Sequence, residues 1–338
     1  MPRSRRSVQK RFLGLAVALL ATACGSPEKI MPEGGGPPVE ALGLDGAALM
    51  RPAVDAEFSQ EQNQELLNLQ PAVGAGDVEA LIWYGRRLGY LGRYRDAIDH
   101  YTAALDRHPE DARLWRHRGH RYLTVRRLGL AVEDLQRAAE LIEGQADSVE
   151  PDGLPNARNE PRSTLGTNVF YHLGLAHYLR GEWGAAVDAY RRCLELSKND
   201  DMRVATSYWL VLALHRRAPQ GGDAADGDLE EAQALLAEIH PDLDVIENHD
   251  YQRLMLAFKG ELELDRVVAE ARAAGAQSAA TVGYGAGAWR LVTGEASVAG
   301  ALWRDVTAGP AWPAFGHLAA EAELAASGAD SATALPAR

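Results

Sequence analysis

The sequence predicts an all-α repeat protein, because one helical pattern recurs along the chain at a fixed spacing. Three pairs of small residues are each 34 residues apart: Gly85 and Gly119, Ala97 and Ala131, and Ala104 and Ala138. Apolar residues around them recur at the three- and four-residue steps of one helix face. Gly260 and Gly294 repeat the spacing in the second half. We therefore expect a solenoid of about six helix pairs, followed by a C-terminal capping helix.

The N-terminal segment, residues 1–23, has the composition of a secretory signal peptide. Five basic residues precede an apolar run from Phe12 to Leu20, and Ala21-Thr22-Ala23 follows it. The apolar run is shorter than the roughly 20 residues that cross a bilayer. This order of charge, apolar run and small residues predicts a segment that directs export and is then removed.

Residues 21–25 also resemble the processing site of a bacterial lipoprotein, with a small residue before Cys24. The resemblance implies that Cys24 is lipidated. Because Gly25 and not aspartate follows the cysteine, it also implies an outer-membrane anchor with the body in the periplasm. Ala21 stands where leucine is commoner. Simple cleavage after Ala23, which would release a soluble secreted protein with a free Cys24, stays open as an alternative.

Charge argues against nucleic acid as a partner. Removing residues 1–23 takes away five positive charges and no acid, which leaves 30 Lys and Arg against 47 Asp and Glu, a net charge of −17. Phosphate backbones are bound by basic surfaces. We therefore expect no nucleic-acid binding.

The remaining chain divides into a tether, an introductory helix and the repeats. Residues 24–54, rich in glycine and proline, predict a flexible tether. Residues 55–77 predict a polar lead-in helix that ends at Pro71. The repeat region is expected as repeats 1 and 2 at 78–145, an inserted loop at 146–166, repeats 3–6 with the capping helix at 167–326, and a frayed tail at 327–338.

Within the repeats, small residues are expected where helices cross. Gly85 and Ala97 should allow the two helices of the first pair to approach closely. Cys193 takes the position of Ala104 and should be a small buried apolar residue. The fifth pair has Arg253 and Asp265 at such positions and should pack more openly. The inserted loop, with three prolines, either folds back on the repeats or acts as a disordered spacer.

These units resemble the tetratricopeptide repeat (TPR) family, strongly in three units and loosely in three more. The resemblance implies a right-handed α-solenoid whose concave groove binds an extended peptide or a helix of a partner protein. Carried over to this sequence, the groove residues are Arg86, Tyr90, Arg113, Arg116, His120, Asn168, Tyr171 and Tyr178.

Three arginines among aromatic residues favour an acidic partner, because guanidinium groups grip carboxylates and stack on rings. The alternative, that these side chains form an ordinary solvated face, stays open. Ile82 stands where the carboxylate-clamp subtype of the family has lysine, so recognition of a C-terminal carboxylate by that clamp is not expected. Charge reversal at Arg113 and Arg116 together should weaken partner capture without unfolding the array.

Catalysis and metal binding are not expected, and no cofactor is predicted. The concentrations of ligand-type residues are His117 with His120, His172 with His177, and Glu247 with His249 and Asp250; none has a zinc-site spacing. Asn248 or Asp250 should cap the helix that contains Tyr251. A metal-binding or catalytic repeat protein, with its site near the 146–166 loop or the Glu247–Asp250 cluster, remains the alternative.

Together these features predict a lipid-anchored scaffold of the bacterial cell envelope. It would bind partner proteins or peptides through the concave groove and act in the assembly of envelope complexes. A soluble secreted TPR scaffold is the third alternative.

Overall fold

A computed structural model describes residues 36–151, 153–218 and 224–333, with the side chains of 224, 225 and 329–333 left out. The predicted signal peptide, Cys24, the first part of the predicted tether and the last five residues of the predicted frayed tail lie outside the described residues.

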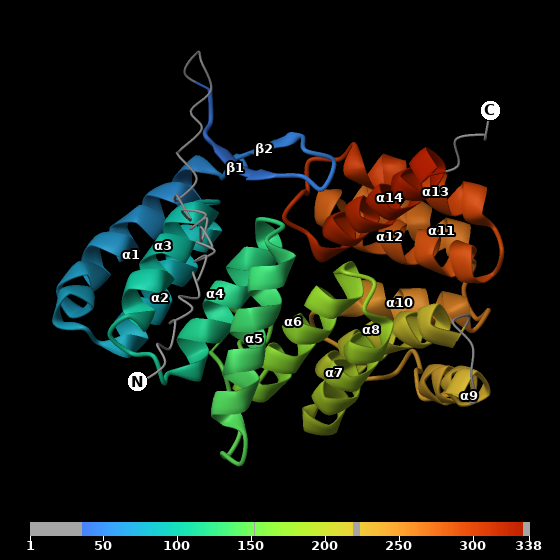
Figure 1. Ribbon diagram of the computed structural model, residues 1–338, viewed down its shortest axis with the longest axis horizontal. Helices are drawn as coiled ribbons and strands as arrows, with labels where there is room; N and C mark the ends of the chain where they lie inside the picture. The colour runs from blue at the N-terminus through green and yellow to red at the C-terminus, as the bar shows by residue number, and fades with distance from the viewer. Residues whose placement is uncertain (1–35, 152, 219–223, 334–338) are drawn as a thin grey trace, which may run out of the picture.

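The described chain is an all-α solenoid preceded by a short hairpin (Figure 1). Its elements are β1 (Val39–Leu42), β2 (Ala48–Met50), α1 (Ala56–Ala75), α2 (Val78–Tyr90), α3 (Tyr94–Leu105), α4 (Ala112–Thr124), α5 (Leu128–Ile142), α6 (Leu165–Leu179), α7 (Trp183–Leu196), α8 (Asp200–Arg217), α9 (Ala224–Ala237), α10 (His249–Phe258), α11 (Leu264–Ala274), α12 (Ala276–Val292), α13 (Ala296–Thr307) and α14 (Phe315–Thr333).

The helices from α2 to α13 form six pairs, and each pair packs mainly on its neighbours in the chain. The predicted all-α solenoid with a capping helix is confirmed, with α14 as the cap. The pair α10–α11 has fewer contacts than the other pairs. Arg253 holds the glycine position there and pairs with Glu270 on α11.

Four glycines of the first helices each face a large side chain 16 residues further along. A Cβ atom at Gly85 would lie 2.2 Å from the ring of Tyr101, and one at Gly174 would lie 2.6 Å from Tyr190. Gly119 faces Leu135 and Gly287 faces Trp303 in the same way. The glycines therefore make room for a bulky residue of the paired helix. The sequence analysis expected Gly85 and Ala97 to let the two helices approach closely, but the side chain that lies against Gly85 is that of Tyr101.

Residues 39–50 form an antiparallel hairpin, where the sequence analysis expected part of a flexible tether. The hairpin is held because its short apolar and charged side chains find partners on the folded body: Ala41 is 2% exposed and packs in a cluster with Tyr94, Val125 and Trp312. The tether prediction is therefore wrong for these residues. The few apolar residues of β1 are enough to hold the hairpin in place, because they pack on a surface that the repeats already form.

The lead-in helix α1 runs through Pro71 and ends at Ala75, where Gly76 takes a left-handed conformation. Pro71 was expected to end it. A proline this close to the C-terminus of a helix removes one hydrogen bond. Buried Gln62 and Leu66, earlier in the helix, anchor α1 on the first repeat.

The two ends of the array meet across its inner face, so the solenoid curls into a nearly closed ring (Figure 1). The Arg126 side chain, 3% exposed, donates to both carboxylate oxygens of Glu321 on α14 and to the carbonyl of Trp312. The indole of Trp312 donates in turn to the carbonyl of Met50 on β2. Repeat 2, the capping helix and the hairpin are thereby joined.

Candidate interaction surface

The predicted groove residues lie on α2, α4 and α6, the first helices of the first three pairs. Two of them cannot contact a partner in this structure. Tyr171 donates to Tyr251 on α10 and accepts from the Trp209 indole, while the hydroxyl of Tyr178 bonds to Tyr284 on α12. Because the array curls, its second half covers α6, and both tyrosines belong to the core.

The middle of the predicted groove holds a carboxylate of the chain itself. Glu150, in the inserted loop, pairs with Arg116 at 3.0 Å between Oε2 and Nη2, and Asn168 donates a short hydrogen bond to the same oxygen. The Glu150 side chain is 9% exposed. Of the predicted positions, Arg116 and Asn168 contact this carboxylate directly, and Arg86 lies close enough to act on it electrostatically.

His117 completes the surroundings of this carboxylate. Arg116 Nη1 lies 2.8 Å from His117 Nδ1, and because arginine only donates, Nδ1 accepts and the ring proton lies on Nε2. Nε2 is 3.2 Å from Glu150 Oε1, without good hydrogen-bond geometry. Burial and the nearby Arg116 lower the pKa of His117 to about 3, so the ring is neutral at neutral pH. Arg116 and His117 keep the pKa of Glu150 well below its usual value despite its burial.

The loop is held over this surface by its backbone as well. Leu165 and Glu150 donate to the carbonyls of Ser148 and Ser163, which closes the loop at its base. Arg86 donates to the carbonyl of Pro151 and to the hydroxyl of Tyr90. The inserted loop therefore folds back on the repeats, the first of the two outcomes considered for it.

Gly153 packs against the same two side chains, Arg86 and Tyr90. A Cβ atom there would lie 1.4 Å from the Tyr90 hydroxyl and 2.7 Å from Arg86 Nη2. With any other residue there, either these two side chains or the loop would have to move. This close approach is a constraint that no sequence pattern showed.

Arg113 and Arg116 are not equivalent, although the sequence analysis treated them together. Arg113 is 36% exposed and pairs with Asp111 and Glu79, both on its own side of the array. Arg116 is buried against Glu150. An acid at position 116 would be buried beside Glu150, so we now expect the double charge reversal to destabilise the fold as well as to weaken partner capture.

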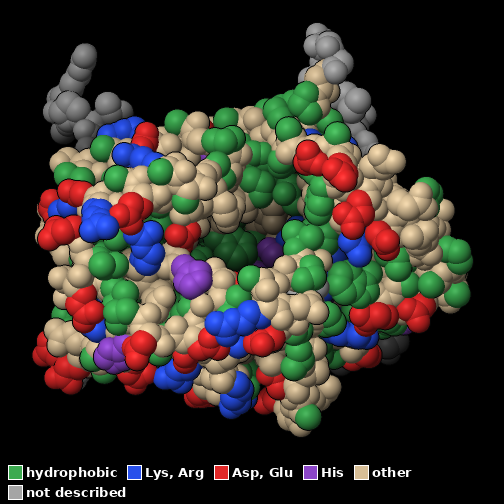
Figure 2. Space-filling model, turned by 180° about the vertical axis from the view of Figure 1, so that it is seen from behind, with side chains coloured by type: hydrophobic (Ala, Val, Ile, Leu, Met, Phe, Trp, Pro, Cys, Tyr) green, Lys and Arg blue, Asp and Glu red, His purple; other side chains and the backbone are tan. Residues whose placement is uncertain are grey.

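A histidine pair borders the carboxylate site. The rings of His120 and His172 lie 4.2 Å apart between centroids, and Phe315 of α14 packs on both. Burial lowers the pKa of His172 to about 3 and that of His120 well below its usual value. Figure 2 shows a hollow at the centre of one face, with hydrophobic side chains on its floor and histidine at its wall.

Arg121 is a residue of this surface that sequence reasoning missed. Its guanidinium stacks 5.5 Å from the ring centroid of Tyr94 and covers Gly89 of α2. Within the described ranges it has no carboxylate partner within ion-pair distance. Arg116 Nε is likewise buried without a hydrogen-bond partner among the described residues. The acid supplied by the loop thus leaves donor capacity unused.

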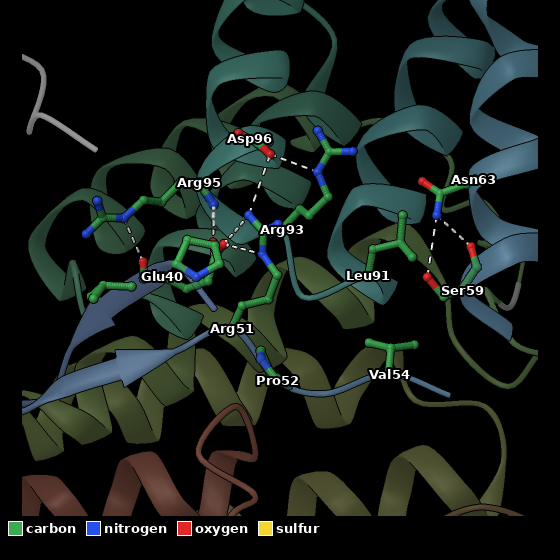
Figure 3. Close-up of a pocket in the computed structure, with 12 residues that line it drawn as sticks. Glu40, Arg51, Pro52, Val54, Ser59, Asn63, Leu91, Arg93, Arg95 and Asp96 are labelled. Atoms are coloured by element: carbon green, nitrogen blue, oxygen red, sulfur yellow. Dashed lines mark hydrogen bonds and ion pairs between the residues drawn. The ribbon is translucent and has the colours of Figure 1, made fainter. Parts of the chain in front are cut away.

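A separate cavity of about 580 Å³ lies between the hairpin, α1 and α3 (Figure 3). Glu40, 2% exposed, accepts from Arg51 at 2.7 Å and from the backbone of Arg95. Arg93 donates to Asp96 next to it. These pairs fix the hairpin to the first repeat, and we assign them a structural role.

The other ligand-type residues are engaged apart from one another. His177 pairs with Glu182, Glu247 accepts from Asn156, and Asp250 accepts from Ser278. In the part of the chain that the structure describes, no group of three such residues is placed to hold a metal ion. Asn248 is the N-cap residue of α10, but its side chain donates to Asp201 and makes no capping bond. Cys193 is buried, as expected.

No described helix is long and apolar enough to span a bilayer.

Comparisons with known proteins agree with the repeats. Two family models, both described as tetratricopeptide repeat, match residues 78–120 and 167–200. The comparison with curated proteins found no match. A solved chain from the "Structure of Naa15/Naa10 bound to HypK-THB" is similar over 75% of this chain and 36% of that chain, with 13% identity and a TM-score of 0.32. This chain spans little more than a third of that chain. Residues 78–120 and 167–200 are therefore similar to tetratricopeptide repeats; the first match covers the pair α2–α3 and most of α4, and the second covers the pair α6–α7.

Proposed function

We propose that this protein is a protein-interaction scaffold of a bacterial cell envelope, anchored by a lipid on Cys24, which binds acidic segments of partner proteins on its inner face. The observation that carries the proposal is the carboxylate held by Arg116 and Asn168. It supports recognition of acidic peptides because the same side chains can hold a carboxylate from another chain.

The surface chemistry fits such a role better than a catalytic one. Arginines on α2 and α4 present several donors toward the inner face, while the body as a whole is acidic. Guanidinium groups bind carboxylates with defined geometry.

The anchor is argued from the sequence of residues 1–25. Fourteen residues, 25–38, separate Cys24 from β1, and an extended chain covers about 3.5 Å per residue. The hairpin would then lie within about 50 Å of the membrane surface. We propose that the edge formed by the hairpin and α14 is the part of the body nearest the membrane.

Labelling with a palmitate analogue tests the anchor. Wild-type protein should take up label and sediment with the outer-membrane fraction, whereas Cys24→Ala should do neither. An unmodified Cys24 in the mature protein, measured by mass spectrometry, would contradict the lipid anchor and favour the soluble form.

Chemical crosslinking in intact envelopes tests the scaffold role. We expect crosslinks from the inner face to defined partner proteins that carry acidic segments. Absence of any reproducible partner, together with stoichiometric metal in elemental analysis of the purified protein, would favour the metal-binding alternative.

A further inference from the structure

The inserted loop occupies the surface that would receive a partner. Its residues 147–151 run across α4 and α6, and its buried acid Glu150 takes the contacts that an acidic peptide would make. Val149, next to Glu150, is 64% exposed, so the segment is fixed by its acid and backbone and not by an apolar anchor. A segment fixed this way can be exchanged for one of similar chemistry.

The acid of the loop uses the available donors incompletely. Glu150 contacts Arg116 through Nη2 alone, and Arg116 Nε stays buried without a partner among the described residues. A carboxylate that bonds two guanidinium nitrogens forms a stronger and more directional contact. Arg121, on the same helix, has no acid at all in the described chain, although burial already lowers its pKa. Buried cations without a partner are costly.

A second carboxylate, supplied by a partner, would give Arg121 the acid that it lacks in the described chain. Arg86, Arg116 and Arg121, which we call the arginine surface, lie close enough to influence one another electrostatically. Tyr90 joins Arg86 at its edge through a 3.2 Å hydrogen bond. Among the described residues, Glu150 is the one loop acid that faces these three arginines, and an external peptide with two or more acids balances their charge better.

We propose that the arginine surface is a binding site for an extended acidic peptide of a partner protein, and that the inserted loop is an internal ligand of this site. The partner carries at least two carboxylates, one in the place of Glu150 and one against Arg121. It displaces residues 147–151 when it binds. This proposal rests on the proposed function and names the partner chemistry for the same inner face.

The internal ligand sets a threshold for binding. A tethered segment competes at an effective concentration in the millimolar range. The apparent affinity for an external peptide is the intrinsic affinity multiplied by the fraction of molecules whose site is open. Weakening the loop should therefore raise the affinity for an external peptide without any change to the arginines.

The test uses purified protein and a labelled peptide with the sequence of residues 146–151, Ala-Asp-Ser-Val-Glu-Pro. Two variants weaken the loop by different means. Glu150→Gln keeps the shape but removes the charge and puts an NH2 donor in place of one acceptor oxygen, while Gly153→Val crowds Tyr90 and Arg86 under the loop and changes no charge. Glu140→Gln, at an exposed acid of α5, is the matched control.

Both loop variants should bind the peptide at least tenfold more tightly than the wild type and the control, with binding that weakens as salt is added. A peptide with glutamine in place of its glutamate should not bind. Equal affinity of folded Glu150→Gln, folded Gly153→Val and wild type would overturn the internal-ligand proposal. Equal binding of the glutamine peptide would overturn carboxylate recognition.

A hexaglutamate peptide tests the second carboxylate. In the Glu150→Gln background, Arg121→Gln should weaken hexaglutamate binding about tenfold and change binding of the loop peptide less. An equal effect on both peptides, or none on either, would overturn the role of Arg121. If neither loop variant folds, faster amide exchange of Glu150 and Leu165 in wild type on adding hexaglutamate supports displacement, and unchanged exchange at saturating peptide overturns it.

This experiment can fail independently of the proposed function. Lipid labelling and partners in the envelope with no peptide binding would leave the scaffold in place and reject this site. Peptide binding without lipid labelling would keep the site and reject the anchor.

Discussion

At the residue scale, the repeats are set by pairs of positions 16 residues apart. Gly85, Gly119, Gly174 and Gly287 each lie under a large side chain of the following helix. The sequence showed that these glycines recur, but it did not show what they face, because the partner of each is fixed by how the two helices cross. A close contact of this kind permits no Cβ atom without movement.

Gly174→Ala should therefore destabilise the protein. The new Cβ atom would lie 2.6 Å from the buried ring of Tyr190, and overpacking of this kind costs about 1–3 kcal/mol. Gly184→Ala is the control, because Gly184 lies in helix α7 with open space around it; it should stabilise by up to about 1 kcal/mol. Urea denaturation measures both, and a stabilising Gly174→Ala would show that the helix pair adjusts freely.

The buried histidines predict a loss of stability in mild acid. His117, His120 and His172 are neutral in the folded protein because burial lowers each pKa, whereas each has a pKa of about 6.5 when unfolded. Below pH 6.5 the unfolded chain binds more protons, so the free energy of unfolding falls as the pH falls. Each histidine contributes up to about 1.4 kcal/mol per pH unit in that range.

Denaturation at pH 7.5, 6.0 and 5.0 measures this effect. The lowered pKa of Glu150 and of Glu321 acts only below about pH 4.5, so it does not interfere in this window. His172→Gln should reduce the slope of the free energy of unfolding against pH by the contribution of about one proton. A free energy of unfolding that is constant from pH 7.5 to 5.0 would contradict neutral buried histidines.

At the element scale, the helices could be predicted and the additions to them could not. The 34-residue period located α2 to α5, α12 and α13 because each repeat has the same local pattern. The hairpin at 39–50 and the folded inserted loop depend on partners far away in the chain, such as Trp312 for Met50 and Asn168 for Glu150. Because the sequence does not reveal these contacts, the two segments were interpreted as a tether and a loop.

The interaction surface shows the same division. Arg116 and Asn168 were assigned to this face from the family resemblance, and both contact Glu150 there. Tyr171 and Tyr178 were assigned to the same face, but the curl of the array buries them. Arg121 was missed because a lone arginine on a helix gives no signal until its neighbours are known to lack an acid.

At the scale of the whole molecule, Arg126 links the second repeat to the capping helix, although its own backbone conformation is strained. Arg126 lies in the turn between the two helices of its repeat, where the first repeat has Gly92, 34 residues earlier, and the last has Gly294. Its φ of 63° is strained for a residue with a side chain. The side chain compensates by bonding Glu321 and the carbonyl of Trp312. The contacts that close the ring therefore offset the strain of this turn.

Arg126→Ala should open the ring and destabilise the protein by about 3–5 kcal/mol, since it takes the arginine away from buried Glu321, which then keeps His317 at 3.1 Å and the backbone N–H of Leu44. Arg126→Gly should open it equally but be about 1 kcal/mol more stable than the alanine variant, because glycine accepts the turn. Arg137→Ala, which breaks an exposed pair with Glu110, should cost less than about 1 kcal/mol.

Small-angle scattering and urea denaturation measure these three variants together. Both changes at Arg126 should increase the radius of gyration, and the change at Arg137 should not. An unchanged radius in Arg126→Gly would mean that the hairpin and α14 hold the ring without this residue.

The crystal structure of Glu150→Gln with the peptide of residues 146–151 bound tests the central claim most directly. The account predicts the glutamate of the peptide on Arg116 and Asn168, with residues 147–151 of the chain withdrawn from α4 and α6. A peptide bound elsewhere, with the loop still in its original position, would contradict it.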